Sequence, residues 1–266
     1  MIEKAKRTLV LDKEIEHITN WIRNYFADNG PTSYAVIGIS GGKDSTIAAA
    51  LCARAIGPDR VIGVLMPDGE QEDIDVARRV CEYLGIDSYE INIGDTTNAF
   101  YEALRSTGLM TNSIVTNNTP ARIRMAILYG LAGIISGRVV NTCNYSEEYV
   151  GYTTKWGDNV GDFAPLAKYT VREVKAIGQA LGLPNEFIEK TPIDGMCGMT
   201  DEENLGFSYD ILDDYILDDK IPDADTLVKI KTLHQRSKHK TGRIEKCHVL
   251  TAHRIGEEWK PEYVYF

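Results

Sequence analysis

One segment constrains the fold of this chain more than any other: an apolar run that ends in a glycine turn and leads directly into a helix. The run covers residues 34–39, the turn reads Ser40-Gly41-Gly42-Lys43-Asp44-Ser45, and an alanine-rich helical pattern follows over 45–56. Glycines let the backbone turn tightly and direct its N–H groups at an anion, and the helix N-terminus adds a favourable dipole. The segment therefore predicts a phosphate site. An ordinary glycine turn capped by Asp44 or Ser45 is the alternative.

The carboxylate in this turn adds a second expectation. Asp44 would lie beside the bound phosphates, which is electrostatically favourable only when a cation such as Mg²⁺ lies between them. The turn is neither the G-x-x-x-x-G-K-[ST] loop of many NTPases nor the G-x-G-x-x-G turn of dinucleotide folds. It therefore indicates a different class of nucleotide site.

Strand and helix patterns alternate through the first half of the chain. Strands are predicted at 34–39, 60–66, 88–93 and 138–142, and helices at about 3–28, 45–56, 71–84, 95–106 and 117–136. This alternation is typical of an α/β fold, a doubly wound parallel sheet flanked by helices. Ligands of such sheets bind beyond the carboxyl ends of the strands, where the glycine turn and Thr142 both fall.

The pattern changes after residue 145. Residues 146–166 are polar, glycine-rich and aromatic with no sustained period, so they are predicted to form a functional loop. Short helices are expected near 170–181, 185–190, 208–219 and 223–238, with a second loop over 194–204. No repeat or linker interrupts the chain, and one domain over residues 1–266 is expected.

The composition excludes some classes of binding partner and indicates the cellular compartment. The formal net charge is 29 − 39 = −10, which argues against nucleic acid as a partner because phosphate backbones require a basic face. The five dispersed cysteines form no C-x-x-C pair and indicate reduced thiols rather than disulfides or zinc. The sequence has neither a secretory signal pattern nor an apolar run long enough for a membrane span. A cytoplasmic protein is expected.

The glycine turn resembles the SGGxDS pyrophosphate loop of the ATP pyrophosphatases, which split ATP into AMP and pyrophosphate. A second segment, Ser146-Glu147-Glu148-Tyr149-Val150-Gly151-Tyr152-Thr153-Thr154-Lys155-Trp156-Gly157-Asp158, narrows this resemblance to the NAD synthetases. Further matching pieces are Ala121-Arg122-Ile123-Arg124-Met125, Lys190-Thr191-Pro192, Asn204-Leu205-Gly206-Phe207-Ser208-Tyr209 and His239-Lys240. The similarity runs in order from about residue 10 to 240. It implies a fold like that of the adenine nucleotide alpha hydrolases, which is Rossmann-like.

The resemblance also implies a set of site residues. Asp44 and Glu147 match positions that hold Mg²⁺, and Asp44 and Lys155 match catalytic positions. The positions matching ATP contacts are Gly38, Ile39, Ser40, Gly41, Gly42, Lys43, Asp44, Ser45, Thr142, Val171 and Ile193. Those matching contacts to nicotinic acid adenine dinucleotide (deamido-NAD) are Arg122, Lys155, Asp162, His239 and Lys240.

Most of these residues also have plainer interpretations. Arg122 suits a solvated helix charge, Glu147 suits the start of a surface helix, and Lys155 and Asp162 suit a polar loop. His239 and Lys240 suit an exposed basic turn.

The chain departs from the family pattern at two ATP positions. Many relatives have lysine where this chain has Val171, and threonine or serine where it has Ile193. Lys168 or Arg172 is expected to supply the missing charge.

The implied reaction is the ATP-dependent amidation of deamido-NAD to NAD, through an acyl-adenylate, with release of AMP and pyrophosphate. Free ammonia is the expected nitrogen donor, because only one helix precedes the glycine turn and no cysteine has an activating context. A homodimer with helix 117–136 at its interface is expected. The competing hypotheses are a GMP synthetase, a tRNA-modifying adenylating enzyme and a regulatory module that binds ATP without turnover.

Overall fold

The computed structural model describes residues 7–189, 200–242, 244, 250–255 and 258–263. Four parallel strands form its central sheet, β1 (Ala35–Gly38), β2 (Val61–Leu65), β3 (Asp87–Glu90) and β4 (Arg138–Val139). The strand order is β3-β2-β1-β4, so the chain first builds the sheet outward from β1 in one direction and then returns to the other side of β1. The carboxyl ends of β1 and β4 therefore flank the point where the strand order reverses, which is where open α/β sheets bind ligands. The predicted α/β fold is confirmed.

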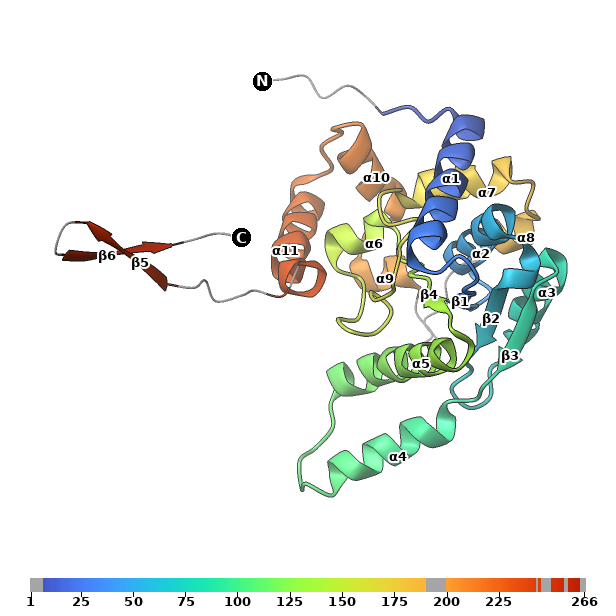
Figure 1. Ribbon diagram of the computed structural model, residues 1–266, viewed down its shortest axis with the longest axis horizontal. Coiled ribbons are helices and arrows are strands. Elements are labelled where there is room, and N and C mark those ends of the chain that lie inside the picture. The colour runs from blue at the N-terminus through green and yellow to red at the C-terminus, as the bar shows by residue number, and fades with distance from the viewer. Residues whose placement is uncertain (1–6, 190–199, 243, 245–249, 256–257, 264–266) are drawn as a thin grey trace.

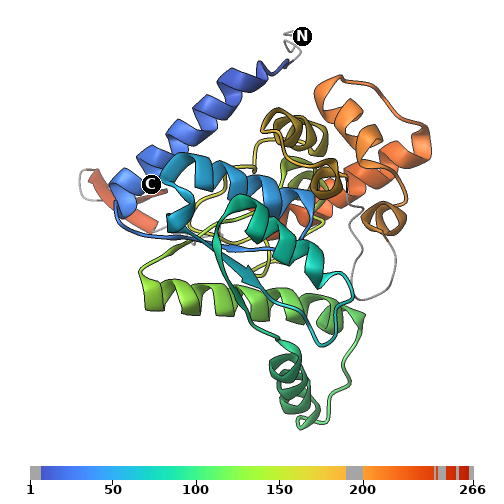
Figure 2. The same ribbon diagram turned by 90° about the vertical axis from the view of Figure 1, so that its right-hand side faces the viewer.

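Helices cover both faces of this sheet (Figures 1 and 2). The first-half helices are α1 (Leu11–Asn29), α2 (Lys43–Ile56), α3 (Ile74–Leu84), α4 (Gly94–Arg105) and α5 (Ser113–Ile135), with a short 3-10 turn at Pro58–Arg60. One face of the sheet packs on α1, α2 and α3 through a large apolar cluster that also includes α7 and α8. The other face packs on α5 through a smaller cluster. Side chains alternate between these clusters along β1, since Ala35 and Ile37 belong to the first and Val36 to the second.

The second half of the chain, as far as the structure describes it, adds six further helices, of which α7 and α8 join the first apolar cluster. They are α6 (Tyr145–Val150), α7 (Val171–Ala180), α8 (Asn185–Ile188), α9 (Asp201–Leu205), α10 (Tyr209–Leu217) and α11 (Ala224–Thr241). A third apolar cluster joins α6, α7, α9, α10 and α11. It places α6 directly beside the end of β4, and α6 carries Glu147.

Several predicted boundaries differ from the observed ones. The predicted loop over 146–166 contains α6, and the predicted loop over 194–204 contains the start of α9. An antiparallel hairpin of β5 (Leu250–Ile255) and β6 (Glu258–Tyr263) was not predicted. Strand β4 is only two residues long; the next residue, Val140, still donates its amide to the Val36 carbonyl of β1 (2.9 Å) and also forms an isolated bridge with Phe163. Among the helices described, none combines the length and the apolar character that a membrane crossing requires.

Candidate active site

The glycine turn after β1 is held closed by its own hydroxyl groups. The Ser45 hydroxyl donates to the Gly42 carbonyl (3.1 Å), and the Gly42 amide donates to the Ser40 hydroxyl (3.2 Å). Gly41 has φ +76°, a conformation that side-chain-bearing residues rarely adopt. Gly42 is the N-cap of α2, so the first amides of this 14-residue helix have no partner within the helix. This combination of a tight turn and a helix N-terminus suits an anion such as a phosphate.

A carboxylate from each strand end meets beside this turn. Asn144, fully buried after β4, donates its side-chain amide to Asp44 Oδ1 at 3.0 Å. The side-chain oxygen of Asn144 accepts a hydrogen bond from the backbone amide of Glu147 (3.0 Å). In return, Glu147 Oε2 accepts one from the backbone amide of Asn144 (3.2 Å), and the two bonds form a capping box at the start of α6. One asparagine thus links the two predicted Mg²⁺ positions and fixes both carboxylates.

A buried lysine balances part of this negative charge. Lys43 is 4 % exposed and its ammonium contacts Asp44 Oδ2 at 2.8 Å. Burial alone would lower the pKa of Lys43. The negative charges of Asp44 and Glu147 have the larger opposite effect, so the pKa of Lys43 is raised. Burial, then the charge of Asp44, raises the pKa of Glu147 to about 8, although Lys43 opposes the shift. Two carboxylates in one confined place are costly without more positive charge.

The donor set fits a magnesium ion that shares its coordination with phosphates. Mg²⁺ is usually held by one or two carboxylates plus substrate phosphates and water, rather than by an all-protein cage. Asp44 and Glu147 supply two such carboxylates next to the anion-binding turn. In the part of the chain that the structure describes, no group of three or more His, Cys, Asp or Glu side chains is arranged to hold a metal. A metal at this place would therefore depend on the nucleotide for further ligands.

Two of the other predicted ATP positions, Thr142 and Val171, lie in segments that contact or precede α6. Thr142 lies between the end of β4 and Asn144 and is partly buried. Val171 is 6 % exposed, belongs to the third apolar cluster, and donates its amide to the Ser146 hydroxyl at 3.0 Å. Ile193 lies outside the described residues. Its role and that of Val171 stay predictions.

Neither cation expected to replace the missing lysine contacts the glycine turn in the described part of the chain. The Arg172 guanidinium pairs with Asp214 (2.5 Å) and Asp218 (3.2 Å) next to α10. The Lys168 ammonium lies 5.8 Å from the centre of the Tyr145 ring. Their charge is directed at other groups, so compensation at Val171 stays an untested prediction.

Three of the predicted dinucleotide positions form one connected group. The Arg122 guanidinium of α5 donates to the Lys155 carbonyl (3.2 Å), and the Lys155 ammonium donates to the His239 carbonyl at the end of α11 (2.6 Å). Lys240 also holds this loop, since its ammonium donates to the carbonyls of Gly151 (3.1 Å) and Thr153 (3.2 Å). The end of α11 therefore fixes the loop that carries Lys155.

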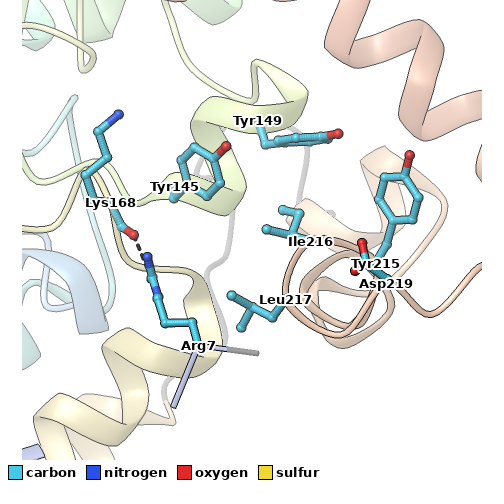
Figure 3. Close-up of a pocket in the computed structure, with 8 residues that line it drawn as sticks. All are labelled: Arg7, Tyr145, Tyr149, Lys168, Tyr215, Ile216, Leu217 and Asp219. Atoms are coloured by element: carbon cyan, nitrogen blue, oxygen red, sulfur yellow. Dashed lines mark hydrogen bonds between the residues drawn. The ribbon is translucent and has the colours of Figure 1, made fainter. Parts of the chain in front are cut away.

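Asp162 lies apart from that group. Its carboxylate accepts the Val139 amide at 2.7 Å, and its other oxygen is 3.5 Å from the Tyr129 hydroxyl of α5. Asp162 and Tyr129 line a cavity of about 500 Å³ together with Ser33 and Arg138. A separate cavity of about 510 Å³ lies on the side of α6 that carries Tyr145 and Tyr149, with Lys168 and Tyr215 in its wall (Figure 3). Among the residues predicted for the site, Lys168, expected to compensate for Val171, lines this second cavity.

Comparison with known proteins agrees with this geometry. The family model described as NAD synthase matches residues 14–254. The chain is 38 % identical over 248 residues to an NH(3)-dependent NAD(+) synthetase of Thermococcus kodakarensis, an alignment that covers 88 % of this chain and 96 % of the relative. The chain belongs to the NAD synthase family. Members of this family are ligases that amidate deamido-NAD to NAD with ATP, so the predicted family and enzyme class are confirmed.

Two solved structures of family relatives share the fold. The NMN synthetase of Francisella tularensis superposes with a TM-score of 0.82 at 31 % identity, covering 90 % of this chain and 99 % of its own. The NH3-dependent NAD synthetase of Campylobacter jejuni superposes with a TM-score of 0.75 at 27 % identity, covering 90 % of this chain and 100 % of its own.

Three residues near the candidate site received no role from the sequence, although Asp158 and Tyr209 lie in matching segments. Asn144 joins the two carboxylates, and Asp158 accepts the Thr154 amide (2.6 Å) and the Thr153 hydroxyl (3.0 Å), which shapes the loop before Lys155. Burial raises the pKa of Asp158. The Tyr209 ring lies 5.9 Å from the Lys43 ammonium, and its hydroxyl is buried without a hydrogen-bond partner among the described residues. The Asn-x-x-Glu spacing of a capping box could have identified Asn144; no comparable signal marks Tyr209.

Proposed function

We propose that this chain makes NAD from deamido-NAD, ATP and ammonia in the crevice between β1 and β4. The observation that carries the proposal is the convergence of Asp44 and Glu147, linked by Asn144, beside the glycine turn. In the first step a carboxylate oxygen of the substrate attacks the α-phosphorus of ATP, and pyrophosphate leaves with the electrons of the broken P–O bond. In the second step ammonia attacks the activated carbonyl, loses a proton, and AMP leaves.

Asp44 and Glu147 are the residues that would hold Mg²⁺ in this proposal. When bound, such an ion neutralises charge on the reacting phosphates and polarises them. The residues Gly38, Ile39, Ser40, Gly41, Gly42, Lys43 and Ser45 would surround the phosphates, with Thr142, Val171 and Ile193 as further ATP positions. The turn contributes oriented amides that need no reorganisation during the reaction, which is the main source of such stabilisation in enzymes.

The loop held by α11 would position the dinucleotide. Lys155 would face the charge that develops between the carboxylate and the α-phosphate, and Arg122, Asp162, His239 and Lys240 would bind the rest of the substrate. The fixed loop supports this assignment, because holding reactants in position supplies much of the acceleration when ATP itself provides the activation. Closure around the adenylate would protect it from water.

The proposal also covers the oligomeric state and the cellular location of the protein. Helix α5 has a high overall apolar content, and two of its side chains are strongly exposed, Ile114 at 70 % and Ile134 at 82 %. Exposed apolar side chains on a helix that already packs on the sheet support a homodimer with α5 at its interface. Residues 1–266 would act as one synthetase domain in the cytoplasm, without nucleic acid or membrane as a partner.

A second candidate substrate is the mononucleotide acid, from which an NMN synthetase makes its product. The specific observation in its favour is the TM-score of 0.82 to the Francisella enzyme, against 0.75 to the Campylobacter NAD synthetase. Both reactions use the same two steps at the carboxylate, so the phosphate turn and the metal ligands would serve either one.

The decisive experiment supplies the purified chain with ATP, Mg²⁺ and an ammonium salt, together with either deamido-NAD or nicotinic acid mononucleotide. We expect NAD, AMP and pyrophosphate in equal amounts from deamido-NAD, measured by liquid chromatography, and a higher kcat/KM for it. A higher kcat/KM for the mononucleotide would favour the second candidate. Binding of ATP without pyrophosphate release with either substrate would indicate a regulatory module instead.

A further inference from the structure

Lys43 occupies an unusual place for a lysine in a nucleotide-binding turn. Its side chain is 4 % exposed and does not extend into solvent to meet a ligand. The ammonium contacts Asp44 Oδ2 at 2.8 Å, lies 5.9 Å from the centre of the Tyr209 ring, and experiences the charges of Glu147 and Asp201. A lysine is almost never buried in this way unless it is paired. Lys43 is therefore a buried part of the cluster formed by Asp44 and Glu147.

The contacts of Asp44 leave little room for a free metal ion. One carboxylate oxygen accepts the Asn144 amide at 3.0 Å, and the other accepts the Lys43 ammonium at 2.8 Å. Glu147 Oε2 is engaged by the backbone amide of Asn144 at 3.2 Å. An ion that binds Asp44 before the nucleotide must displace or crowd the ammonium, and it meets a pair of carboxylates whose charge is already partly neutralised.

We propose that Lys43 is a built-in counter-cation of the Asp44–Glu147 pair, which keeps divalent metal weakly bound until the phosphates of the nucleotide arrive. The inference rests on the proposed function, because it takes Asp44 and Glu147 as the metal ligands. The negative charge of ATP reverses the balance, since the phosphates supply further ligands and leave enough negative charge for both the ammonium and the metal. Metal and nucleotide then enter together rather than in either order.

This role differs from that of a simple phosphate ligand. A lysine that only binds phosphate affects the affinity for ATP and has no influence on metal binding in the absence of nucleotide. A counter-cation has the opposite signature, because removing its charge strengthens metal binding to the nucleotide-free protein. The two roles are therefore separated by a measurement without ATP.

The test is Mn²⁺ titration of the nucleotide-free full chain, with free Mn²⁺ read by electron paramagnetic resonance. Lys43→Met keeps an unbranched side chain of similar size but removes the charge, and Lys43→Gln is the alternative if Lys43→Met does not fold by circular dichroism. We expect the Kd for Mn²⁺ to fall about tenfold or more in either variant. Lys13→Met, which removes an exposed lysine of α1, should leave the Kd unchanged and controls for net charge.

Two results would overturn the inference. An unchanged or weaker Mn²⁺ affinity in both Lys43 variants, including no detectable binding in any protein, would reduce Lys43 to a phosphate ligand. Tightened binding that persists when Asp44→Asn is added to Lys43→Met would place the metal elsewhere. Synthesis of NAD is assayed separately, so a wrong substrate assignment would show there and leave the Mn²⁺ titration unaffected.

Discussion

The side-chain amide of Asn144 donates a hydrogen bond to Asp44 at 3.0 Å, although the two residues are 100 positions apart in the sequence. The same asparagine caps α6 and so orients Glu147. A single buried side chain therefore sets the relation between the glycine turn after β1 and the acidic helix after β4. Such supporting residues hold ligands in place without contacting the substrate.

Replacement of Asn144 should impair function more than stability. We expect Asn144→Ala to lose about 1 kcal/mol of unfolding free energy, typical of a lost N-cap, and about tenfold or more in NAD formation. Asn112→Ala is the matched control, because Asn112 caps α5 through the Val115 amide (3.1 Å) and, in the described part of the chain, does not bond to Asp44 or Glu147. Urea unfolding and initial rates measure the two effects. Equal losses of activity in both variants would contradict the role of Asn144.

Neutralising either acidic residue should stop adenylation without unfolding the protein. Asp44→Asn and Glu147→Gln keep the side-chain shape but remove a ligand charge, so pyrophosphate release should fall about 100-fold or more at ordinary Mg²⁺. Glu148→Gln, one position along α6, should remain close to the unmodified protein. A near-normal rate in either test variant would remove that residue from the metal site.

The end of α11 should control the loop that carries Lys155. We expect Lys240→Ala to increase hydrogen–deuterium exchange over residues 151–159 and to raise KM for deamido-NAD several-fold, because two hydrogen bonds to the Gly151 and Thr153 carbonyls are lost. Lys238→Ala removes an exposed lysine from the same turn of the helix and serves as the control. Unaltered exchange in Lys240→Ala would show that the loop is held by other contacts.

A buried aspartate predicts a pH effect on stability. Asp213 is fully buried, accepts the Ser146 hydroxyl (2.5 Å) and the Arg172 amide (2.7 Å), and burial raises its pKa above the ordinary value. A carboxyl whose pKa is raised on folding stabilises the protein below its unfolded pKa, and this contribution is lost as pH rises through the folded pKa.

The stability of the unmodified protein relative to Asp213→Asn should therefore decrease as pH rises from about 4 toward neutrality. Asp210→Asn, at an exposed position of the same helix, should show no such trend. The measurement is the urea midpoint of each protein across this pH range. A relative stability that increases with pH would mean that the hydrogen bonds to Asp213 outweigh its burial.

Free ammonia should be the nitrogen donor. Amidases that use glutamine need a thiolate nucleophile, but burial raises the pKa of Cys52 to about 12 and that of Cys143 well above its ordinary value, and Cys81 is buried. Cys197 and Cys247 lie outside the described residues. We expect NAD from an ammonium salt at mildly alkaline pH and negligible NAD from ammonia-free glutamine. Added glutaminase should restore the second reaction, and comparable rates without it would contradict the prediction.

The longest apolar runs could be predicted from the sequence because each is bounded by residues typical of turns. The parallel strands β1 and β2 and helices α2 and α5 fall close to their predicted ranges, although α5 begins at Ser113 rather than at residue 117. The glycine turn was also predictable, since a strand, a turn and a helix in succession leave few alternative structures.

Helix α8, of four residues, was predicted near 185–190, but two other short helices were missed because they are too short to show a period. Helix α6 has six residues and α9 has five, less than two turns each, so their capping boxes at Asn144 and Thr200 were the only local signal. The pairing of Lys155 with His239 and of Arg172 with Asp214 depends on tertiary contacts that no local pattern encodes. For this reason the sequence predicts candidate residues of the site but not the partners that hold them.

The reversal of strand order has a consequence for how the protein acquires its activity. Strand β4 pairs with β1 on the side opposite β2, and the segment through β2, β3, α4 and α5 separates the two strands in the sequence. Contacts of such long sequence separation form late and slowly. A chain folded only as far as its first three strands would present the glycine turn without its second carboxylate. If Asp44 and Glu147 hold the metal as proposed, capture of a metal–nucleotide complex would mark completed folding and could be followed in time during refolding.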